Sequence, residues 1–232
     1  MVYEHTVPGV FIERPNRFIA VVSVDGQPQR VHVKNTGRCR ELLIPGTEVY
    51  LAEGTAPGRK TKYDLIGCLR KADPENQRAQ RLIHMDSQAP NRIAREWLAS
   101  RPVTDIKAEY TWGNSRLDFF FREEGKPCLM EVKGVTLETG GTAFFPDAPT
   151  ERGVKHLKEL TAAVTQGYGA YVCFVVQMDG VQEVLPNEAT DPAFAAAYRE
   201  AVAAGVKVVT LGCSVRLEES RFVSEVNFEK IT

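Results

Sequence analysis

The length and composition of the chain are those of an ordinary globular protein. Its 232 residues, of which 43% are hydrophobic and 25% charged, are enough for one large domain or two small ones. The formal net charge of −1 does not by itself indicate a nucleic-acid-binding protein, and no apolar run reaches membrane-spanning length.

The cysteines and the N-terminus favour a cytoplasmic protein. The five cysteines are widely scattered and no two have the spacing of a zinc knuckle, so we expect buried free thiols in a reducing compartment. The first residues, "MVYEHTVPGVFIE", lack the charged and then apolar pattern of a signal peptide.

The charge is unevenly distributed along the chain. Residues 1–72 hold 11 Lys and Arg against 7 Asp and Glu, a net charge of +4, whereas the remainder holds 18 against 23, a net charge of −5. The polar stretch "RKADPENQRAQ" (70–80) separates the two parts and does not resemble a core element. The sequence therefore predicts two domains, residues 1–80 and 81–232.

The first domain is predicted to be a small β-barrel. Short alternating stretches such as "FIAVVSV" and "QRVHVK", joined by the turn dipeptide "DG", indicate a hairpin, and two further strands follow at 47–53 and 62–70. Several short strands with turn signals suit a closed five-stranded barrel. Cations lie beside its turns and on its strand faces, and either a solvated face or nucleic-acid contacts would explain them: Arg14, Arg17, Arg30, Lys34, Arg38, Arg40, Arg59, Lys60 and Lys62.

The second domain alternates helix and strand. Helices are predicted at 89–101, 150–167 and 191–205, with Thr150 and Asp191 as N-caps. Three strands lie between the first two helices, and the apolar segments "GAYVCFVVQ" and "VKVVTL" follow as buried strands. The predicted fold class is therefore mixed α/β, with a central sheet that begins antiparallel and continues parallel.

A β-hairpin in this domain carries three charged residues of interest. If its turn is centred between Glu124 and Gly125, Asp118 lies directly opposite Glu131, with the two Cβ atoms about 5 Å apart. Strict alternation then places Leu117 with the apolar face of the hairpin, and Asp118, Glu131 and Lys133 together on the other face.

Two explanations of this acidic pair remain open from the residues alone. Arg116 and Lys133 flank the pair, so that an ion-pair cluster on a solvated sheet face would neutralise it. Alternatively, the two carboxylates bind Mg²⁺ or Mn²⁺ together with water and a substrate phosphate, and Lys133 neutralises charge that develops on that phosphate.

The hairpin motif resembles that of the PD-(D/E)XK nuclease superfamily, an Asp on one strand followed by Glu-X-Lys on the next. Nearly the whole chain also resembles the sugar fermentation stimulation protein A family. Six separated blocks carry this likeness: "NTGRCRELLIPG" (35–46), "RKTKYDL" (59–65), "DSQAPN" (86–91), "SRLDFFF" (115–121), "EVKGVTL" (131–137) and "FPDAPTERGVKHLKEL" (145–160). The segment "RPNRFIA" departs from the basic-aromatic run that is common in the family, because Pro15 and Asn16 replace two of its residues.

The resemblance implies an N-terminal OB-like barrel joined to a restriction-endonuclease-like α/β domain. It also implies DNA binding with little sequence preference and a role in regulating sugar (maltose) metabolism. Carried over by position, the catalytic residues are Asp118, Glu131 and Lys133, with Asp118 and Glu131 as metal ligands. The DNA-binding residues are expected among the basic side chains of both domains: Arg14, Arg17, Lys34, Arg38, Arg59, Lys60, Arg152 and Lys155.

Several side chains and functions stay open at this level. Glu96 on the first helix is a candidate additional metal ligand or a solvated residue, and Glu109 is a similar case. His156, on the second helix, either acts beside the metal or is structural. Three functions are compatible with the sequence: a DNA-binding protein, an active Mg²⁺-dependent nuclease, and a regulator that does not bind nucleic acid and whose acidic pair is structural. The C-terminal "RFVSEVNFEKI" is expected to be a strand that pairs within the chain or with a second copy in a homodimer.

Overall fold

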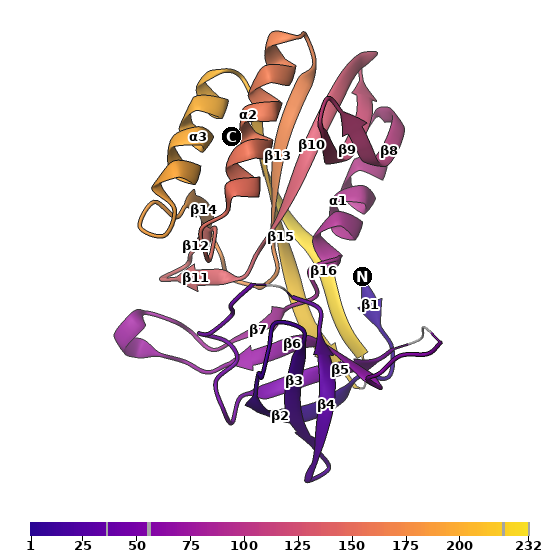
Figure 1. Cartoon of the computed structure of the whole chain (residues 1–232), viewed down its shortest axis with the longest axis vertical. Coiled ribbons are helices and arrows are strands. Elements are labelled where there is room, and N and C mark those ends of the chain that lie inside the picture. Colours follow the sequence, from indigo (N-terminus) through magenta and orange to yellow (C-terminus); the bar gives the residue numbers. More distant parts are fainter. Residues whose placement is uncertain (36, 55–56, 220, 232) are drawn as a thin grey trace.

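The computed structural model describes the whole chain except residues 36, 55–56, 220 and 232, and only the backbone of residues 227–231. A barrel formed by the first third of the chain lies below a larger layered body of sheet and helices (Figure 1). The fold class is mixed α/β, as the sequence predicted.

The barrel is a closed antiparallel sheet in which one parallel pairing joins β4 to β6. The order of its strands is β4-β3-β2-β5-β6-β7. The predicted hairpin turn is present, since Asp25 and Gly26 both have positive φ, as a two-residue hairpin turn requires. The strands are β2 (Val7–Glu13), β3 (Ile19–Val24), β4 (Gln27–Val33), β5 (Glu48–Glu53), β6 (Tyr63–Arg70) and β7 (Arg81–His84).

The larger sheet has the order β1-β16-β15-β13-β10-β9-β8. Its pairs β8–β9 and β9–β10 are antiparallel and its pairs β10–β13 and β13–β15 are parallel, which confirms the predicted antiparallel start and parallel continuation. The C-terminal strand pairs with β15 inside the same chain. The strands are β1 (Val2–Tyr3), β8 (Val103–Trp112), β9 (Ser115–Glu123), β10 (Lys126–Val135), β13 (Gly169–Val176), β15 (Lys207–Glu218) and β16 (Arg221–Ile231).

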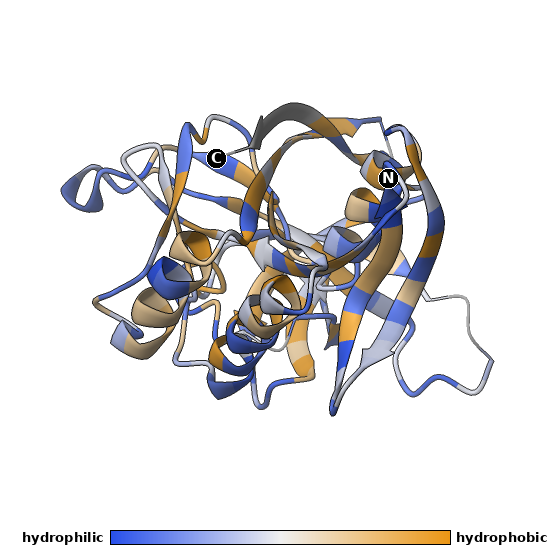
Figure 2. Ribbon diagram, turned by 90° about the horizontal axis from the view of Figure 1, so that it is seen from above, coloured by the Kyte–Doolittle hydropathy of each residue, from blue (hydrophilic) through white to orange (hydrophobic). Residues whose placement is uncertain are grey.

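Helices cover both faces of the larger sheet. Helix α1 (Ala89–Ala99) packs Ile93, Ala94, Trp97 and Leu98 on one face, while α2 (Glu151–Thr165) and α3 (Pro192–Ala203) lie on the other. The predicted N-caps are both confirmed, because Thr150 accepts a hydrogen bond from Gly153 N and Asp191 accepts one from Phe194 N. Figure 2 shows apolar positions along the central strands and mixed positions on the helices, as an amphipathic helix requires.

A second small sheet was not predicted. The strands β11 (Leu137–Thr139), β12 (Thr142–Phe145) and β14 (Glu183–Pro186) form it, and a short 3-10 helix, η1 (Pro74–Asn76), lies in the polar stretch between β6 and β7 of the barrel. Glu138 of β11 is fully buried between Arg70 and Arg81 of the barrel, with 2.6 Å between its Oε2 and Arg70 Nη2. This buried ion pair links the barrel to the small sheet.

The barrel and the larger sheet also pack directly on each other. The ring of Phe222 on β16 lies against Gly67 on β6, where an added Cβ would come within 2.4 Å of a ring carbon. Gly67 is therefore required for close contact between the two sheets. None of the described helices is long and apolar enough to cross a membrane.

Candidate active site

The predicted register of the β9–β10 hairpin is confirmed. Glu124 and Gly125 both have positive φ and form its turn, and the ladder pairs Cys128 with Phe121 and Met130 with Phe119. This register sets Asp118 against Glu131 across the two strands. The ladder itself ends at the Phe119–Met130 pair, so the strands separate where the acidic couple begins.

The predicted alternation of faces is wrong at Leu117. Leu117 packs with Phe120, three positions later, in the core on the α2 and α3 side of the sheet. Phe119 and Phe121 pack in the core on the α1 side. The opposite strand is irregular at the same level, because Glu109 has a φ of 53° and no Glu109–Asp118 pair occurs in the β8–β9 ladder. The backbone irregularity changes the direction in which side chains leave β9 at this point.

Asp118 is consequently held from the α1 side of the sheet and not, as strict alternation predicted, on the same side as Glu131 and Lys133. Its Oδ1 accepts a hydrogen bond from Asn91 Nδ2 of α1 at 2.7 Å, and its Oδ2 accepts one from the main-chain N–H of Val132 at 2.7 Å. Val132 directly follows Glu131, so the Asp118 carboxylate lies against the segment of β10 that carries the second acid. Sequence reasoning missed Asn91, although it ends one of the family-like blocks.

Glu131 is held from the α2 side and is 4% exposed. One carboxylate oxygen, Oε1, accepts hydrogen bonds from Lys133 Nζ at 2.6 Å and from His156 Nδ1 of α2. The other oxygen, Oε2, is buried and has no hydrogen-bond partner among the described residues. Because an unsatisfied buried carboxylate oxygen is costly, this atom indicates a position where a cation would bind.

The pKa values of the two acids are shifted in opposite directions. Burial and the neighbouring Glu131 raise the pKa of Asp118 above its usual value. Burial would also raise the pKa of Glu131, but the hydrogen bond from His156 and the charge of Lys133 outweigh it and hold the pKa of Glu131 below its usual value. The two neighbouring carboxylates therefore differ in basicity: Glu131 on β10 is the stronger acid, and Asp118 on β9 is the weaker one.

The donor set suits a hard divalent cation better than zinc. No cluster of three or more His, Cys, Asp and Glu side chains arranged for a metal occurs in the described part of the chain. Mg²⁺, however, needs only one or two carboxylates and completes its shell with water and substrate phosphate. Asp118 and the unpaired Oε2 of Glu131 offer oxygen ligands of this kind, so the chemistry of the donor set fits such an ion.

Helix α2 brings basic side chains to the site. Its Arg152 Nε lies 3.4 Å from His156 Nε2, and Lys155 forms an ion pair with Glu159 at 3.7 Å. Arg152, Lys155 and His156 line a groove of about 380 Å³ together with Arg116 of β9. His156 is therefore hydrogen-bonded to Glu131, and the predicted cations Arg152 and Lys155 line the same groove as His156.

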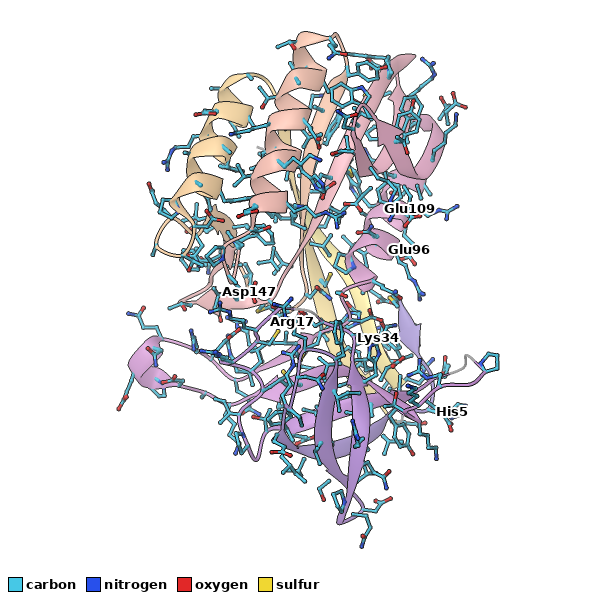
Figure 3. All side chains as sticks on the ribbon, in the orientation of Figure 1. His5, Arg17, Lys34, Glu96, Glu109 and Asp147 are labelled. Atoms are coloured by element: carbon cyan, nitrogen blue, oxygen red, sulfur yellow. The ribbon has the colours of Figure 1, made fainter. Side chains whose placement is uncertain are left out.

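The two other candidate acids lie on the outer side of α1 and β8 (Figure 3). Glu96 is exposed and does not line the groove at Asp118. Glu109 does line that groove, but it is exposed and forms an ion pair with Arg116 at 3.6 Å. Neither side chain is hydrogen-bonded to Asp118 or Glu131 in the described structure.

The basic residues predicted on the barrel are used in two different ways. Three are bound within the protein: Lys34 to buried Asp86 at 2.7 Å, Arg59 to Asp64, and Arg14 to the carbonyl groups of four residues. Exposed Arg17 and Arg38, in contrast, line a cleft of about 490 Å³ with Arg14, Arg40 and the 148–149 segment of the larger body. Lys60 is also exposed. Figure 3 shows Arg17 and Asp147 on facing sides of this junction.

Comparison with known proteins matches most of the chain. The family model described as the SfsA N-terminal OB domain matches residues 12–75, and the one described as the sugar fermentation stimulation protein RE domain matches residues 88–219. The sugar fermentation stimulation protein homolog of Desulfitobacterium hafniense (strain DSM 10664 / DCB-2) is 51% identical over 218 residues, 93% of this chain and 92% of that protein. The homolog of Clostridium beijerinckii is 46% identical over 93% of each chain.

One solved structure is similar over almost the full length. It is described as Pyrococcus furiosus SfsA in complex with Ca²⁺, and it covers 97% of this chain and 96% of its own. Its sequence is 28% identical and its TM-score is 0.83. Barrel and larger body therefore occur together in that protein as they do here.

Proposed function

The chain belongs to the sugar fermentation stimulation protein family, as its sequence blocks predicted, and on this premise we propose that it is a DNA-binding protein with a divalent-metal-dependent phosphodiesterase site. One observation carries the proposal. Glu131 has a buried, unpaired Oε2, and the next residue, Val132, donates its main-chain N–H to Asp118. Lys133 Nζ donates a hydrogen bond to the other oxygen of the Glu131 carboxylate. Two carboxylates and an ammonium group in this relation match a metal site that acts on a phosphodiester.

Asp118 and Glu131 would hold the metal. A Mg²⁺ or Mn²⁺ ion there would supply Lewis-acid activation of the phosphodiester and of the attacking water. The Ca²⁺ complex of the Pyrococcus furiosus protein supports a divalent cation in this family. Asn91 and the Val132 N–H fix the orientation of Asp118, while His156 and Lys133 keep Glu131 ionised and therefore ready to bind the cation.

Lys133 has a second role in the proposal. Its side chain is largely buried and its ammonium group lies 2.6 Å from Glu131, so it is fixed at the rim of the site. A fixed cation in a partly dry site stabilises negative charge that develops on a phosphate more strongly than a solvated one does. Lys133 would therefore stabilise the transition state of hydrolysis.

The barrel would contribute binding to the DNA backbone. Arg17, Arg38 and Arg40 line the cleft between barrel and body, and exposed arginines in a concave surface are well suited to phosphates. Such contacts carry no sequence information, which agrees with little sequence preference. Regulation of sugar (maltose) metabolism, which the family likeness implies, would act through the same contacts.

A cleavage assay tests the catalytic part of the proposal. Labelled single-stranded, duplex and branched DNA is incubated with the protein and Mg²⁺ or Mn²⁺, alongside Asp118→Asn and Lys133→Ala. We expect cleavage by the wild-type protein and loss of at least a hundredfold in both variants. Cleavage that survives both substitutions would show that a contaminant is responsible.

A binding assay tests the DNA-binding part. In Ca²⁺, the affinity for DNA should fall steeply as salt rises, because phosphate contacts release counterions. Binding without cleavage in any metal would leave a DNA-binding protein whose acidic couple is structural. Absent or salt-insensitive binding would instead favour a regulator that does not bind nucleic acid.

A further inference from the structure

A second basic groove opens on Asp118 from the opposite side of the sheet to α2. It has a volume of about 390 Å³ and lies between the first half of α1 and strand β8. Asn91, Arg92, Arg95, Glu109 and Asp118 line it. Asp118 is thus reached through this groove, whereas Arg152, Lys155 and His156 line the groove on the α2 side.

The two arginines of the α1 groove have no partner in the described part of the chain. Arg92 and Arg95 are exposed, and neither guanidinium forms an ion pair or a side-chain hydrogen bond there. They are three positions apart and therefore lie on one side of α1, next to the buried pair Ile93 and Ala94. Glu109, the acidic residue facing them across the groove, is paired with Arg116.

The positions of these arginines are not explained by helix stability. Arg92 lies in the first turn of α1, where the helix macrodipole disfavours a positive charge, and that turn contains no acidic residue. The other acidic residue of the groove, Asp118, is already bound by Asn91 and by the Val132 N–H. Arg92 and Arg95 therefore remain available to bind an anion that enters the groove.

From this arrangement we propose that Arg92 and Arg95 bind backbone phosphates of the DNA strand on the α1 side of the scissile phosphate. The proposal rests on the function proposed above and extends it to residues outside the metal site. Two carboxylates at the fork repel an approaching phosphate chain, so flanking cations are needed to hold it in place. Arg116, Arg152 and Lys155 lie on the α2 side. The DNA strand would therefore cross the point where β9 and β10 separate, with cations on both sides of it.

Guanidinium groups suit this role because of their shape. An arginine can donate two parallel hydrogen bonds to one phosphate, whereas a lysine acts as a single point charge. Two arginines one helical turn apart can contact neighbouring phosphates of one strand. They would act as binding and positioning residues, because neither forms a hydrogen bond or an ion pair with Asp118 or Glu131 in the described part of the chain.

The test compares DNA binding by Arg92→Gln/Arg95→Gln with that by Arg199→Gln. Arg199 is an exposed arginine on α3, remote in the sequence and paired with Glu188, so it is a matched control. Binding to labelled single-stranded and duplex DNA is measured in Ca²⁺ over a range of salt concentrations. We expect the double variant to bind about tenfold more weakly and the slope of log affinity against log salt to lose about 1.8 for duplex DNA, at about 0.9 per phosphate contact.

Arg92→Lys/Arg95→Lys refines the result. It retains the charge but not the paired hydrogen bonds, so it should recover the salt slope and only part of the affinity. Equal affinity and equal slope in the wild-type protein and the glutamine variant would overturn the proposal. So would a calorimetric titration in which inorganic phosphate alone binds the wild-type protein tightly and abolishes the difference, since that indicates an isolated anion site.

The outcome is separable from that of the proposed function. If the wild-type protein binds DNA through Arg92 and Arg95 but cleaves none in Mg²⁺ or Mn²⁺, the catalytic proposal fails and this one stands. If the glutamine variant binds and cleaves DNA as the wild-type protein does, the proposal for Arg92 and Arg95 fails and the catalytic proposal stands. Because both arginines are exposed, unchanged circular dichroism and melting temperature are expected for the variants.

Discussion

The carboxylate of Asp118 accepts a hydrogen bond from the main-chain N–H of Val132, with 2.7 Å between the two atoms. Val132 stands between Glu131 and Lys133, so this bond fixes Asp118 of β9 against the part of β10 that carries the other two motif residues. The β9–β10 ladder has already ended one pair earlier, at Phe119 and Met130. The relation of the two acids therefore depends on the Asp118 side chain itself as well as on the sheet.

Removing the charge of Asp118 should abolish stabilisation by metal. A ligand that binds only the folded state stabilises it by about 2.7 kcal/mol at a hundred times its Kd, which raises the melting temperature of a protein of this size by about 5 °C. We expect that rise with Ca²⁺ for the wild-type protein, measured by differential scanning calorimetry, and little or none for Asp118→Asn. Asp25→Asn, at the exposed β3–β4 turn, should keep the full rise. An unchanged rise in Asp118→Asn would mean that the ion binds elsewhere.

The hydrogen bond from His156 to Glu131 should strengthen metal binding. His156 is buried and donates to the Glu131 carboxylate, so it fixes the orientation of that carboxylate and keeps it ionised. Replacing such a partner typically weakens metal affinity by about 10- to 100-fold. We expect that loss for His156→Gln in a calorimetric titration with Ca²⁺, and no loss for Lys158→Gln, an exposed substitution on the same helix. Equal affinities would assign His156 a purely structural role.

The sequence was sufficient for much of the site because the hairpin is locally determined. The turn at Glu124 and Gly125 and the apolar residues of one face fix the register, and the register sets Asp118 opposite Glu131 in the sequence of the hairpin. The helices were equally predictable, since Thr150 and Asp191 are N-caps with clear local signals.

The remaining features depend on contacts between distant parts of the chain. The irregularity at Leu117 and Asp118 is set by the geometry of strand β8 and by Asn91 of α1, neither of which the hairpin sequence records. Likewise, the pairing of β1 with β16 joins the two ends of the chain. Charge alone also could not separate Lys34, which is bound to Asp86, from exposed Arg17, because both appear as cations near turns.

Lys34 should therefore contribute to folding more than to DNA binding. Asp86 is fully buried and its carboxylate is bound by Lys34 at 2.7 Å and by the Tyr3 hydroxyl at 2.7 Å. Removing one partner of a buried ion pair leaves the other charge uncompensated and costs about 3 kcal/mol. Lys34→Gln should lower the free energy of unfolding in urea by that amount and leave the salt dependence of DNA binding unchanged.

Arg17→Gln is the matched comparison, with the opposite expectation. Because Arg17 is exposed at the cleft, its loss should leave the free energy of unfolding unchanged and reduce the salt slope by about 0.9 for duplex DNA. A Lys34 variant of normal stability that binds DNA with a smaller slope would contradict the structural assignment of Lys34.

The last prediction concerns pH and the buried His84. This side chain is fully buried between barrel and body, its Nε2 lies 3.0 Å from the Tyr3 hydroxyl, and its ring is 5.3 Å from that of Phe222. Burial lowers its pKa to about 4, and the nearby N-terminal ammonium and Lys34 act in the same direction against Asp86. The ring is therefore neutral in the folded protein at neutral pH.

Stability should decrease as the pH falls from about 6.5 towards 4. In that window the unfolded chain, whose histidine has the ordinary pKa of about 6.5, binds a proton that the folded protein does not. The contribution is fully present above about pH 6.5, and its loss amounts to about 3 kcal/mol once both states are protonated. Urea unfolding of the wild-type protein and of His84→Gln across this range measures the difference, which should shrink steadily towards low pH. His5→Gln, at an exposed position beside the barrel (Figure 3), should retain the wild-type pH dependence. A parallel pair of curves for wild-type protein and His84→Gln would instead assign the acid sensitivity to other groups.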